Sequence, residues 1–156
     1  MEKTTDTSDQ HPEARILPAV FKDFGGAVQF GGTAVTVKCF EDNSRIKELS
    51  QTPGNGRILV VDGGGSRRFT LCGDIIAMDL QKNGWAGIVI YGCVRDAAVL
   101  ATVPIGIKAL AAHPRKTARL NEGQVGVKLD IGGVAVESGD IVIADEDGVL
   151  LLPAAS

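Results

Sequence analysis

The sequence predicts a mixed α/β domain in which a compact, barrel-like sheet is covered on one side by helices. Apolar runs typical of strands alternate with two helical segments in the first two thirds of the chain, and the final third contains only strands and tight turns. Glycine is frequent, with 20 residues in 156, and aromatic residues make up only 4%. The core is therefore aliphatic, the turns are tight, and the length suits one domain.

Composition argues against several classes of protein. The net charge is −3, and lysine and arginine are scattered, which argues against nucleic acid as a direct partner. No stretch approaches the roughly 20 apolar residues of a membrane span, and the polar N-terminus has no apolar signal core. Three widely spaced cysteines, Cys39, Cys72 and Cys93, are typical of reduced thiols in a cytoplasmic protein and do not have zinc-site spacing.

Residues 1–15 are expected to form a polar N-terminal arm, and residues 16–156 to form the single domain. A short helix can form in the arm before His11-Pro12 ends it, and we expect the arm to be mobile. The pattern then predicts two short strands or one strongly bent pair around Gly31-Gly32, over residues 27–40. A helix over 44–51, capped by Glu41-Asp42-Asn43, and a strand over 57–62 follow.

A glycine-rich loop, Gly63-Gly64-Gly65-Ser66, comes directly after that strand. A dinucleotide loop would need glycine at position 68, where Arg68 stands, and the G-K-[ST] of a Walker A loop is absent. We therefore interpret the loop as a turn that needs positive φ or close backbone approach, and expect no nucleotide or methyl-donor cofactor there.

The central stretch combines a helix over 75–83 with an apolar strand over 85–92. Asp74 precedes the helix, and Arg95-Asp96 follows the strand. Twenty residues lie between Asp74 and Arg95. Because one helix followed by one strand returns the chain to the same end of a sheet, we expect these three residues to lie together. Beyond them the pattern predicts a short helix or turn over 97–100, strands over 104–110, 125–131, 134–136, 141–145 and 149–152, and hairpin turns at Gly132-Gly133 and Asp147-Gly148.

These residue types suit a small anionic substrate and a hard cation. Mg²⁺ and Mn²⁺ prefer oxygen ligands and keep several waters, so Asp96 can bind the ion and Asp74 can hold a metal-bound water. Arg95 carries a planar fork suited to a carboxylate or an enolate oxygen. The helix opens with N–H groups that can bind a substrate carboxylate, those of Gly73, Asp74, Ile75 and Ile76.

A purely structural interpretation stays open. Asp74 can be a helix cap, and Arg95-Asp96 can be a solvated turn whose charges pair locally. Cys72 and Cys93 are expected to pack as small apolar residues. His113 precedes Pro114-Arg115-Lys116, which indicates an exposed turn rather than a catalytic base.

Motifs from about residue 16 onward carry a family likeness: Phe24-Gly25-Gly26, residues 36–43, residues 60–66, Gly73-Asp74, residues 92–96, residues 105–109, Pro114-Arg115-Lys116, and Gly139-Asp140 through Asp147-Gly148. Through them the chain resembles the family that contains the regulator of ribonuclease activity A and the class II 4-hydroxy-4-methyl-2-oxoglutarate aldolases. The resemblance implies a swivelling β/β/α domain that assembles as a ring-shaped homotrimer, with active sites at the subunit boundaries.

The aldolase signature of that family is an aspartate, 20 residues, then Arg-Asp, matched here by Asp74, Arg95 and Asp96. The match implies that residues 73–76 bind the pyruvyl carboxylate, Arg95 contacts the carbonyl or enolate oxygen, Asp96 holds the metal and Asp74 positions metal-bound water. The implied reaction is Mg²⁺- or Mn²⁺-dependent cleavage of 4-hydroxy-4-methyl-2-oxoglutarate, or a related 2-oxo acid, to pyruvate, with oxaloacetate decarboxylase activity.

The alternative function implied by the resemblance is a regulator that binds and inhibits an endoribonuclease of the ribonuclease E type without catalysis. Enterobacterial regulators lack the acid after the arginine, and this chain keeps Asp96, which favours the enzyme. Longer aldolases carry an acidic residue on a C-terminal extension, whereas this sequence stops at Ser156, so decarboxylation is expected to survive more easily than aldol cleavage. Thr7-Ser8 stands where relatives usually have an apolar residue, which predicts poor docking of the N-terminal helix.

Overall fold

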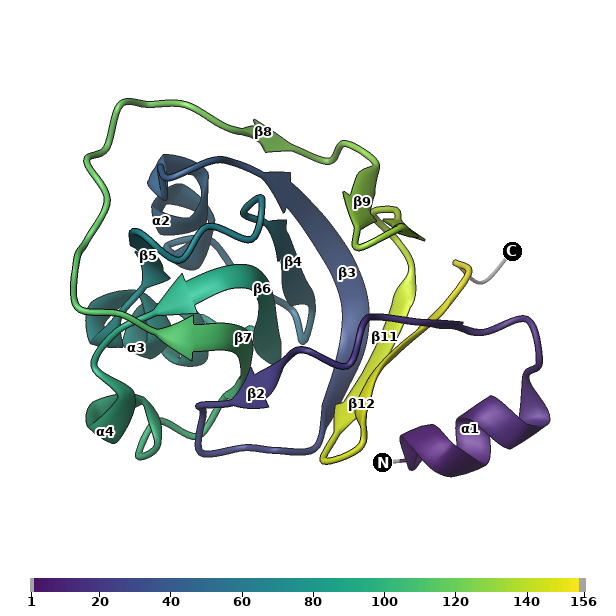
Figure 1. The fold of residues 1–156 in the computed structure, drawn as a ribbon. Coiled ribbons are helices and arrows are strands. Elements are labelled where there is room, and N and C mark those ends of the chain that lie inside the picture. Colours follow the sequence, from purple (N-terminus) through teal and green to yellow (C-terminus); the bar gives the residue numbers. More distant parts are fainter. Residues whose placement is uncertain (1, 155–156) are drawn as a thin grey trace.

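A strongly curled sheet forms the body of the computed structural model, which describes residues 2–154, and helices α2, α3 and α4 cover one of its faces (Figure 1). This arrangement confirms the predicted mixed α/β class. The elements are α1 (Thr4–Gln10), β1 (Arg15–Ile16), β2 (Lys22–Asp23), β3 (Phe30–Lys38), α2 (Ser44–Ser50), β4 (Ile58–Asp62), β5 (Thr70–Cys72), α3 (Asp74–Lys82), β6 (Gly87–Val94), α4 (Ala97–Leu100), β7 (Gly106–Ala112), β8 (Gln124–Val125), β9 (Leu129–Ile131), β10 (Val134–Val136), β11 (Ile141–Asp145) and β12 (Gly148–Leu152).

The large sheet has the strand order β1-β12-β11-β3-β4-β6-β7-β2, with β5 added beside β6 and β8 beside β3. Strands β3, β4, β6 and β7 run parallel and are joined by the crossover helices, whereas β11 and β12 form an antiparallel hairpin. Parallel strands connected by helices end at the same edge of a sheet. The segments that follow β5, β6 and β7 therefore gather at one edge of the molecule.

Strand β3 is a single curved strand rather than the two short strands or bent pair expected around Gly31-Gly32. Its first residues pair antiparallel with β11, and from Ala34 onward it pairs in parallel with β4. The glycine at position 32 is required by close packing, since a Cβ there would lie 2.2 Å from the carbonyl oxygen of Gly56. The change of partner along one strand curls the sheet.

The curled sheet is buried on both faces, and β4 illustrates how one strand serves two cores. Leu59 and Val61 pack in the cluster beneath the helices, whereas Ile58 and Val60 pack in the cluster formed with β9 to β12. Successive side chains of a strand point to opposite faces, so a strand covered on both sides is an unbroken apolar run.

Most element predictions are confirmed within a few residues, and the differences are informative. Strand β6 continues two residues past Gly92 to Val94, so Arg95 follows the strand directly. The run over 125–131 divides into β8 and β9, and the three-residue strand β5 was not predicted. The two hairpin turns join β9 to β10 and β11 to β12 as expected. Among residues 2–154, no helix is both long enough and apolar enough to cross a membrane.

The N-terminal helix α1 is docked, and the expectation of poor docking is wrong. The backbone N–H and the hydroxyl of Thr4 donate hydrogen bonds to the Asp145 carboxylate at 2.9 and 2.7 Å. Thr7 is only 1% exposed, and its hydroxyl donates to the carbonyl oxygen of Lys3 at 2.9 Å. Small polar side chains thus replace the missing apolar contact because each hydroxyl has a hydrogen-bond partner.

Asp145 is the residue on which this docking depends. Burial opposes its ionisation, but the hydrogen bonds from Thr4 and the backbone of Asp147, with the nearby charge of Lys108, hold the pKa of Asp145 below its ordinary value. The carboxylate therefore stabilises the fold fully above about pH 4, the unfolded pKa, and that stabilisation is lost as the pH falls through the lower folded pKa.

We predict that Asp145→Asn lowers the free energy of unfolding at pH 7 by about 1.5–3 kcal/mol, because charged hydrogen bonds become neutral ones. The deficit relative to the wild type should shrink below about pH 4, because Asp145 takes up a proton there in the unfolded wild-type chain and at still lower pH in the folded one. Urea unfolding at pH 7 and pH 3 measures both values. Asp147→Asn, an exposed neighbour on the same turn, is the control. A deficit that is equal at the two pH values would contradict the prediction.

Candidate functional site

The candidate site lies at the sheet edge where β5 and β6 end. Asp74 is the first residue of α3, two positions after β5, and Arg95-Asp96 follows β6 directly. The backbone N–H of Asp74 donates a hydrogen bond to Oδ2 of Asp96 at 3.2 Å. The structure therefore brings together the three residues that the sequence singled out.

The backbone at Asp96 is unusual, since this residue adopts the left-handed conformation with φ 63° and ψ 40°. Its carbonyl oxygen accepts the N–H groups of Val99 and Leu100, both at 2.9 Å, and so begins α4. Gly73 makes room for the Asp96 carboxylate, because a Cβ at position 73 would lie 2.8 Å from Oδ2. A strained non-glycine residue is typical of functional sites, where the surrounding structure maintains it.

The N-terminus of α3 offers fewer open donors than the sequence suggested. Gly73, not Asp74, is the N-cap, and Oδ1 of Asp74 accepts the N–H of Ile75 at 2.8 Å. The N–H groups of Asp74 and Ile75 therefore already have carboxylate partners. Within residues 2–154, the N–H groups of Gly73 and Ile76 have no hydrogen-bond partner, so these two can bind an anion without competition.

Arg95 is held by its backbone and free at its side chain. Its N–H donates to the carbonyl oxygen of Cys72 at 3.0 Å, which locks the start of the loop against β5. Its Nε lies 4.0 Å from Oδ2 of Asp96, and the two side chains are 39% and 37% exposed. An exposed ion pair at this distance contributes little, so the guanidinium can bind a ligand.

An open pocket of about 470 Å³ lies beside Arg95 and the first turn of α3. Asp74 lines it, whereas Asp96 lines a smaller adjoining hollow of about 230 Å³ together with Arg95 and His113. Arg95 borders both spaces. His113 is thus closer to the site than its sequence context indicated, and its Nδ1 accepts the N–H of Arg115 at 3.1 Å.

Sequence reasoning missed the residues of a second wall of the pocket: Asn43, Lys47, Lys116, Thr117, Ala118 and Arg119. The side-chain amide of Asn43 is buried, and it donates to the carbonyl oxygen of Leu71 at 3.1 Å. Its Oδ1 accepts from the Thr117 hydroxyl at 3.1 Å and from Nε of Arg119 at 3.0 Å. The basic turn at Pro114-Arg115-Lys116 was the one signal in the sequence for this wall.

The cysteines near the site are not nucleophiles. Burial raises the pKa of Cys72 to about 12, and the charges of Asp96 and Asp74 act in the same direction. Burial likewise raises the pKa of Cys93. Both remain protonated thiols at neutral pH, which fits the expectation that they pack as small apolar residues.

The glycine-rich loop is a turn, as predicted from the sequence. Gly64 and Gly65 have φ values of 68° and 72°. The N–H groups of Gly63 and Gly65 donate to the carbonyl oxygen of Tyr91, both at 3.1 Å, and that of Gly64 donates to Oδ1 of Asp62 at 2.9 Å. Because these N–H groups bond within the protein, the loop cannot cradle a phosphate.

The oxygen donors of the site are typical of an open site for a hard divalent ion, and not of a metal centre that is enclosed by protein ligands. No group of three or more His, Cys, Asp or Glu side chains is placed to hold a metal within the described part of the chain. The carboxylates of Asp74 and Asp96 instead lie on adjoining backbone segments. Mg²⁺ and Mn²⁺ are commonly bound by one or two carboxylates and several waters, so this donor set suits them.

Comparison with known proteins gives a consistent family. The sequence profile of the RraA-like family, described as Aldolase/RraA, matches residues 4–151. A protein of Alkalilimnicola ehrlichii, provisionally named 4-hydroxy-4-methyl-2-oxoglutarate aldolase, is 50% identical over 149 residues, which cover 95% of this chain and 92% of the relative. A Deinococcus radiodurans protein with the same provisional name is 48% identical over 98% of this chain and 96% of its own.

Two solved structures are similar along the whole fold. The RNA-processing inhibitor RraA from Thermus thermophilis is 47% identical with a TM-score of 0.96, covering 100% of this chain and 95% of that one. A structure from Geobacillus kaustophilus, named S-adenosylmethionine: 2-dimethylmenaquinone methyltransferase, is 40% identical with a TM-score of 0.95, covering 99% and 96%. One scaffold therefore carries three different functional names.

Proposed function

The chain belongs to the RraA-like family, and on this premise we propose that it is a divalent-metal-dependent lyase. Its proposed substrate is 4-hydroxy-4-methyl-2-oxoglutarate or a related 2-oxo acid, which it cleaves to pyruvate, and oxaloacetate decarboxylation is a further proposed activity. The observation that carries this proposal is the hydrogen bond from Asp74 to Asp96 with Arg95 beside it, at the border of an open pocket.

In this proposal the pyruvyl carboxylate binds at the N-terminus of α3. The unpaired N–H groups of Gly73 and Ile76 donate to it, and the positive end of the helix dipole favours the negative charge. The side chain of Ile75, also at the pocket wall, is 64% exposed and offers an apolar surface to the substrate carbons. Binding at this end orients the 2-oxo group toward Arg95.

Arg95 acts where charge develops. When the C3–C4 bond of the 2-oxo acid breaks, its electron pair forms the C2=C3 bond of an enolate, and a guanidinium fork can donate to the resulting enolate oxygen. The other fragment leaves as a second pyruvate, after the 4-hydroxyl has lost its proton to water, or as carbon dioxide when the substrate is oxaloacetate. The enolate then takes up a proton at C3 to give pyruvate.

Asp96 would hold the divalent ion, and Asp74 would position a water bound to that ion. When bound, the ion would polarise the 2-oxo group as a Lewis acid. The Asp96 carboxylate would be positioned for this by Gly73 and by its own backbone conformation.

We predict that the purified protein releases pyruvate from 4-hydroxy-4-methyl-2-oxoglutarate or oxaloacetate when Mg²⁺ or Mn²⁺ is added, and that a chelator abolishes the release. A coupled assay for pyruvate measures it.

Asp96→Asn keeps an oxygen but loses the charge, so it should demand far more metal for any residual rate. Arg95→Lys keeps the charge but loses the fork, and should lower kcat and kcat/KM together by about a hundredfold.

Arg68→Lys is the matched control, because Arg68 is an exposed arginine that pairs with Glu41 away from the pocket. It should retain wild-type kinetics. No pyruvate from either substrate would overturn the lyase proposal. If Arg95→Lys keeps wild-type kinetics, Arg95 and Asp96 form a solvated turn and have no part in catalysis.

A second candidate function rests on the Thermus relative, whose name describes an inhibitor of RNA processing. By that likeness the chain would bind an arginine-rich segment of an endoribonuclease of the ribonuclease E type, without catalysis. The net charge of −3 is compatible with such a partner. Binding should be detectable by pull-down at low ionic strength and weaken with salt, because exposed charge contacts are screened. Absence of association at low salt would exclude this function.

The ring-shaped homotrimer is likewise a proposal, supported by an exposed apolar surface. Phe40, Leu120 and Val125 are 58%, 66% and 45% exposed. They lie on two segments that are joined by hydrogen bonds. Strand β3 pairs with β8, and the N–H of Leu120 donates to the Asp42 carboxylate. Exposed apolar residues gathered on neighbouring segments are typical of subunit interfaces.

We therefore predict a solution mass three times the chain mass of 16.3 kDa, measured by light scattering coupled to size exclusion. Phe40→Glu should shift the mass toward that of one chain, because a buried charge would be unpaired at the interface. Val99→Glu, which changes an exposed apolar residue on α4, is the control. A wild-type protein that elutes with the mass of one chain would contradict the trimer.

A further inference from the structure

The backbone next to Phe40 and Leu120, two of the exposed apolar residues, is strained. Each is followed by a non-glycine residue in the left-handed region, Glu41 with φ 54° and Asn121 with φ 58°. The Glu41 carboxylate is held by two hydrogen bonds from the Arg68 guanidinium, at 2.7 and 2.8 Å. Such strain persists only where the surrounding structure maintains it, and it gathers at functional surfaces. The exposure of these two apolar residues is therefore maintained by specific contacts.

An open groove of about 340 Å³ lies beside the Phe40 ring. The ring rests on the backbone of Gly64, since a Cβ at that position would lie 2.8 Å from ring atom Cδ1. The charged lining residues of the groove are Lys38, Asp62 and Glu122. Within residues 2–154, no cationic side chain lies within ion-pair distance of either acid. An aromatic ring beside unpaired carboxylates suits a guanidinium, which can stack on the ring and pair with the acids.

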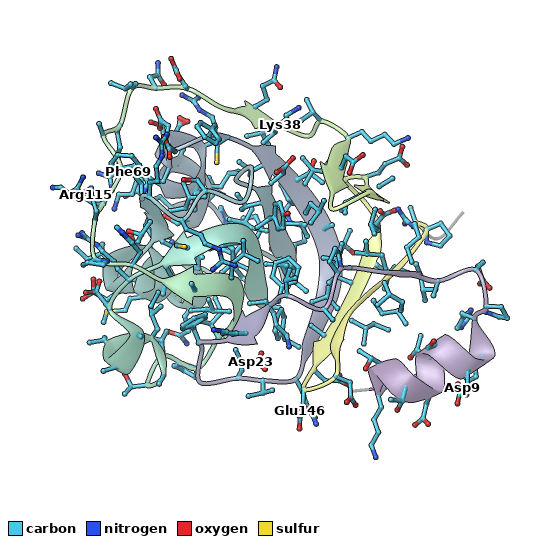
Figure 2. All side chains as sticks on the ribbon, in the orientation of Figure 1. Asp9, Asp23, Lys38, Phe69, Arg115 and Glu146 are labelled. Carbon is cyan, nitrogen blue, oxygen red and sulfur yellow. The ribbon has the colours of Figure 1, made fainter. Side chains whose placement is uncertain are left out.

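A second face of the molecule carries the complementary charge, on two arginines that we call the basic edge. Arg67 and Arg115 are exposed, and in the described part of the chain no carboxylate lies within ion-pair distance of either. Their segments are joined, because the backbone N–H of Thr70 donates to the carbonyl oxygen of Arg115 at 2.8 Å. Figure 2 shows Arg115 next to Phe69 at the left edge of the molecule, whereas Lys38, which lines the groove, lies at the top.

We propose that the groove of one copy of this chain receives the basic edge of the next copy, so that the copies join head to tail into a ring. This inference rests on the proposed trimer and names the two surfaces that form it. A closed ring of three requires a heterologous contact, in which each copy uses two different faces. The groove is continuous with the exposed surface at Phe40, and the basic edge is a different face of opposite charge.

The same charges disfavour a contact between two identical faces. Two grooves that faced each other would bring together Asp62 and Glu122 of both copies, and two basic edges would bring together four arginines. Like charges that oppose each other across an interface are strongly unfavourable. Opposite charges on the two faces therefore favour a ring over a dimer with an isologous interface.

Exchanging the charges between the two faces tests this contact. Glu122→Arg makes the groove net positive, and Arg67→Glu together with Arg115→Glu makes the edge negative. Each of these two variants should shift the solution mass from three chains toward one, measured by light scattering at low ionic strength. The variant that combines all three substitutions should regain the mass of three chains, because the two faces again carry opposite charges. Circular dichroism during thermal unfolding checks that each variant is folded.

Lys82→Glu is the control, because Lys82 is an exposed cation at the end of α3, outside both faces, and this variant should keep the mass of three chains. A wild-type trimer that both charge variants leave intact would overturn the docking and keep the trimer. A combined variant that stays at the mass of one chain would also overturn the docking. A wild-type protein with the mass of one chain would overturn the trimer itself, and this inference with it.

Discussion

The candidate site depends on the hydrogen bonds of one three-residue strand, β5. Thr70 donates its N–H to the carbonyl oxygen of Arg115, Leu71 accepts from the Asn43 amide, and the carbonyl oxygen of Cys72 accepts the N–H of Arg95. Each residue of the strand therefore fixes a different part of the pocket. Because β5 itself pairs in parallel with β6, these parts are held by the rigid centre of the sheet rather than by loops.

Two features of the site cost stability and are maintained by the packing around them. Asp96 is a non-glycine residue in the left-handed region, which costs about 1–3 kcal/mol. Asn43 is a buried polar side chain, and it is tolerated because both ends of its amide are hydrogen-bonded. Both residues place a functional group, the Asp96 carboxylate and the Arg119 guanidinium, at the border of a pocket.

The similar proteins bear the names of an aldolase, an inhibitor of RNA processing and a methyltransferase, although their fold is nearly the same. A fold alone does not decide between such activities, which depend on the residues of the site. Here the glycine-rich loop bonds its own N–H groups, and the cations gather at the α3 pocket. This distribution favours small anionic substrates over a phosphate or a methyl donor bound at that loop.

The sequence determined the local elements and the first half of the site. Apolar periodicity located most helices and strands, and the spacing of Asp74 from Arg95-Asp96 predicted their meeting, since one helix and one strand return the chain to the same edge. Only the tertiary structure decided the continuity of β3, the existence of β5 and the contact of Asn43 with Arg119. Those features depend on pairing between segments far apart in the chain, and local periodicity carries no information about such partners.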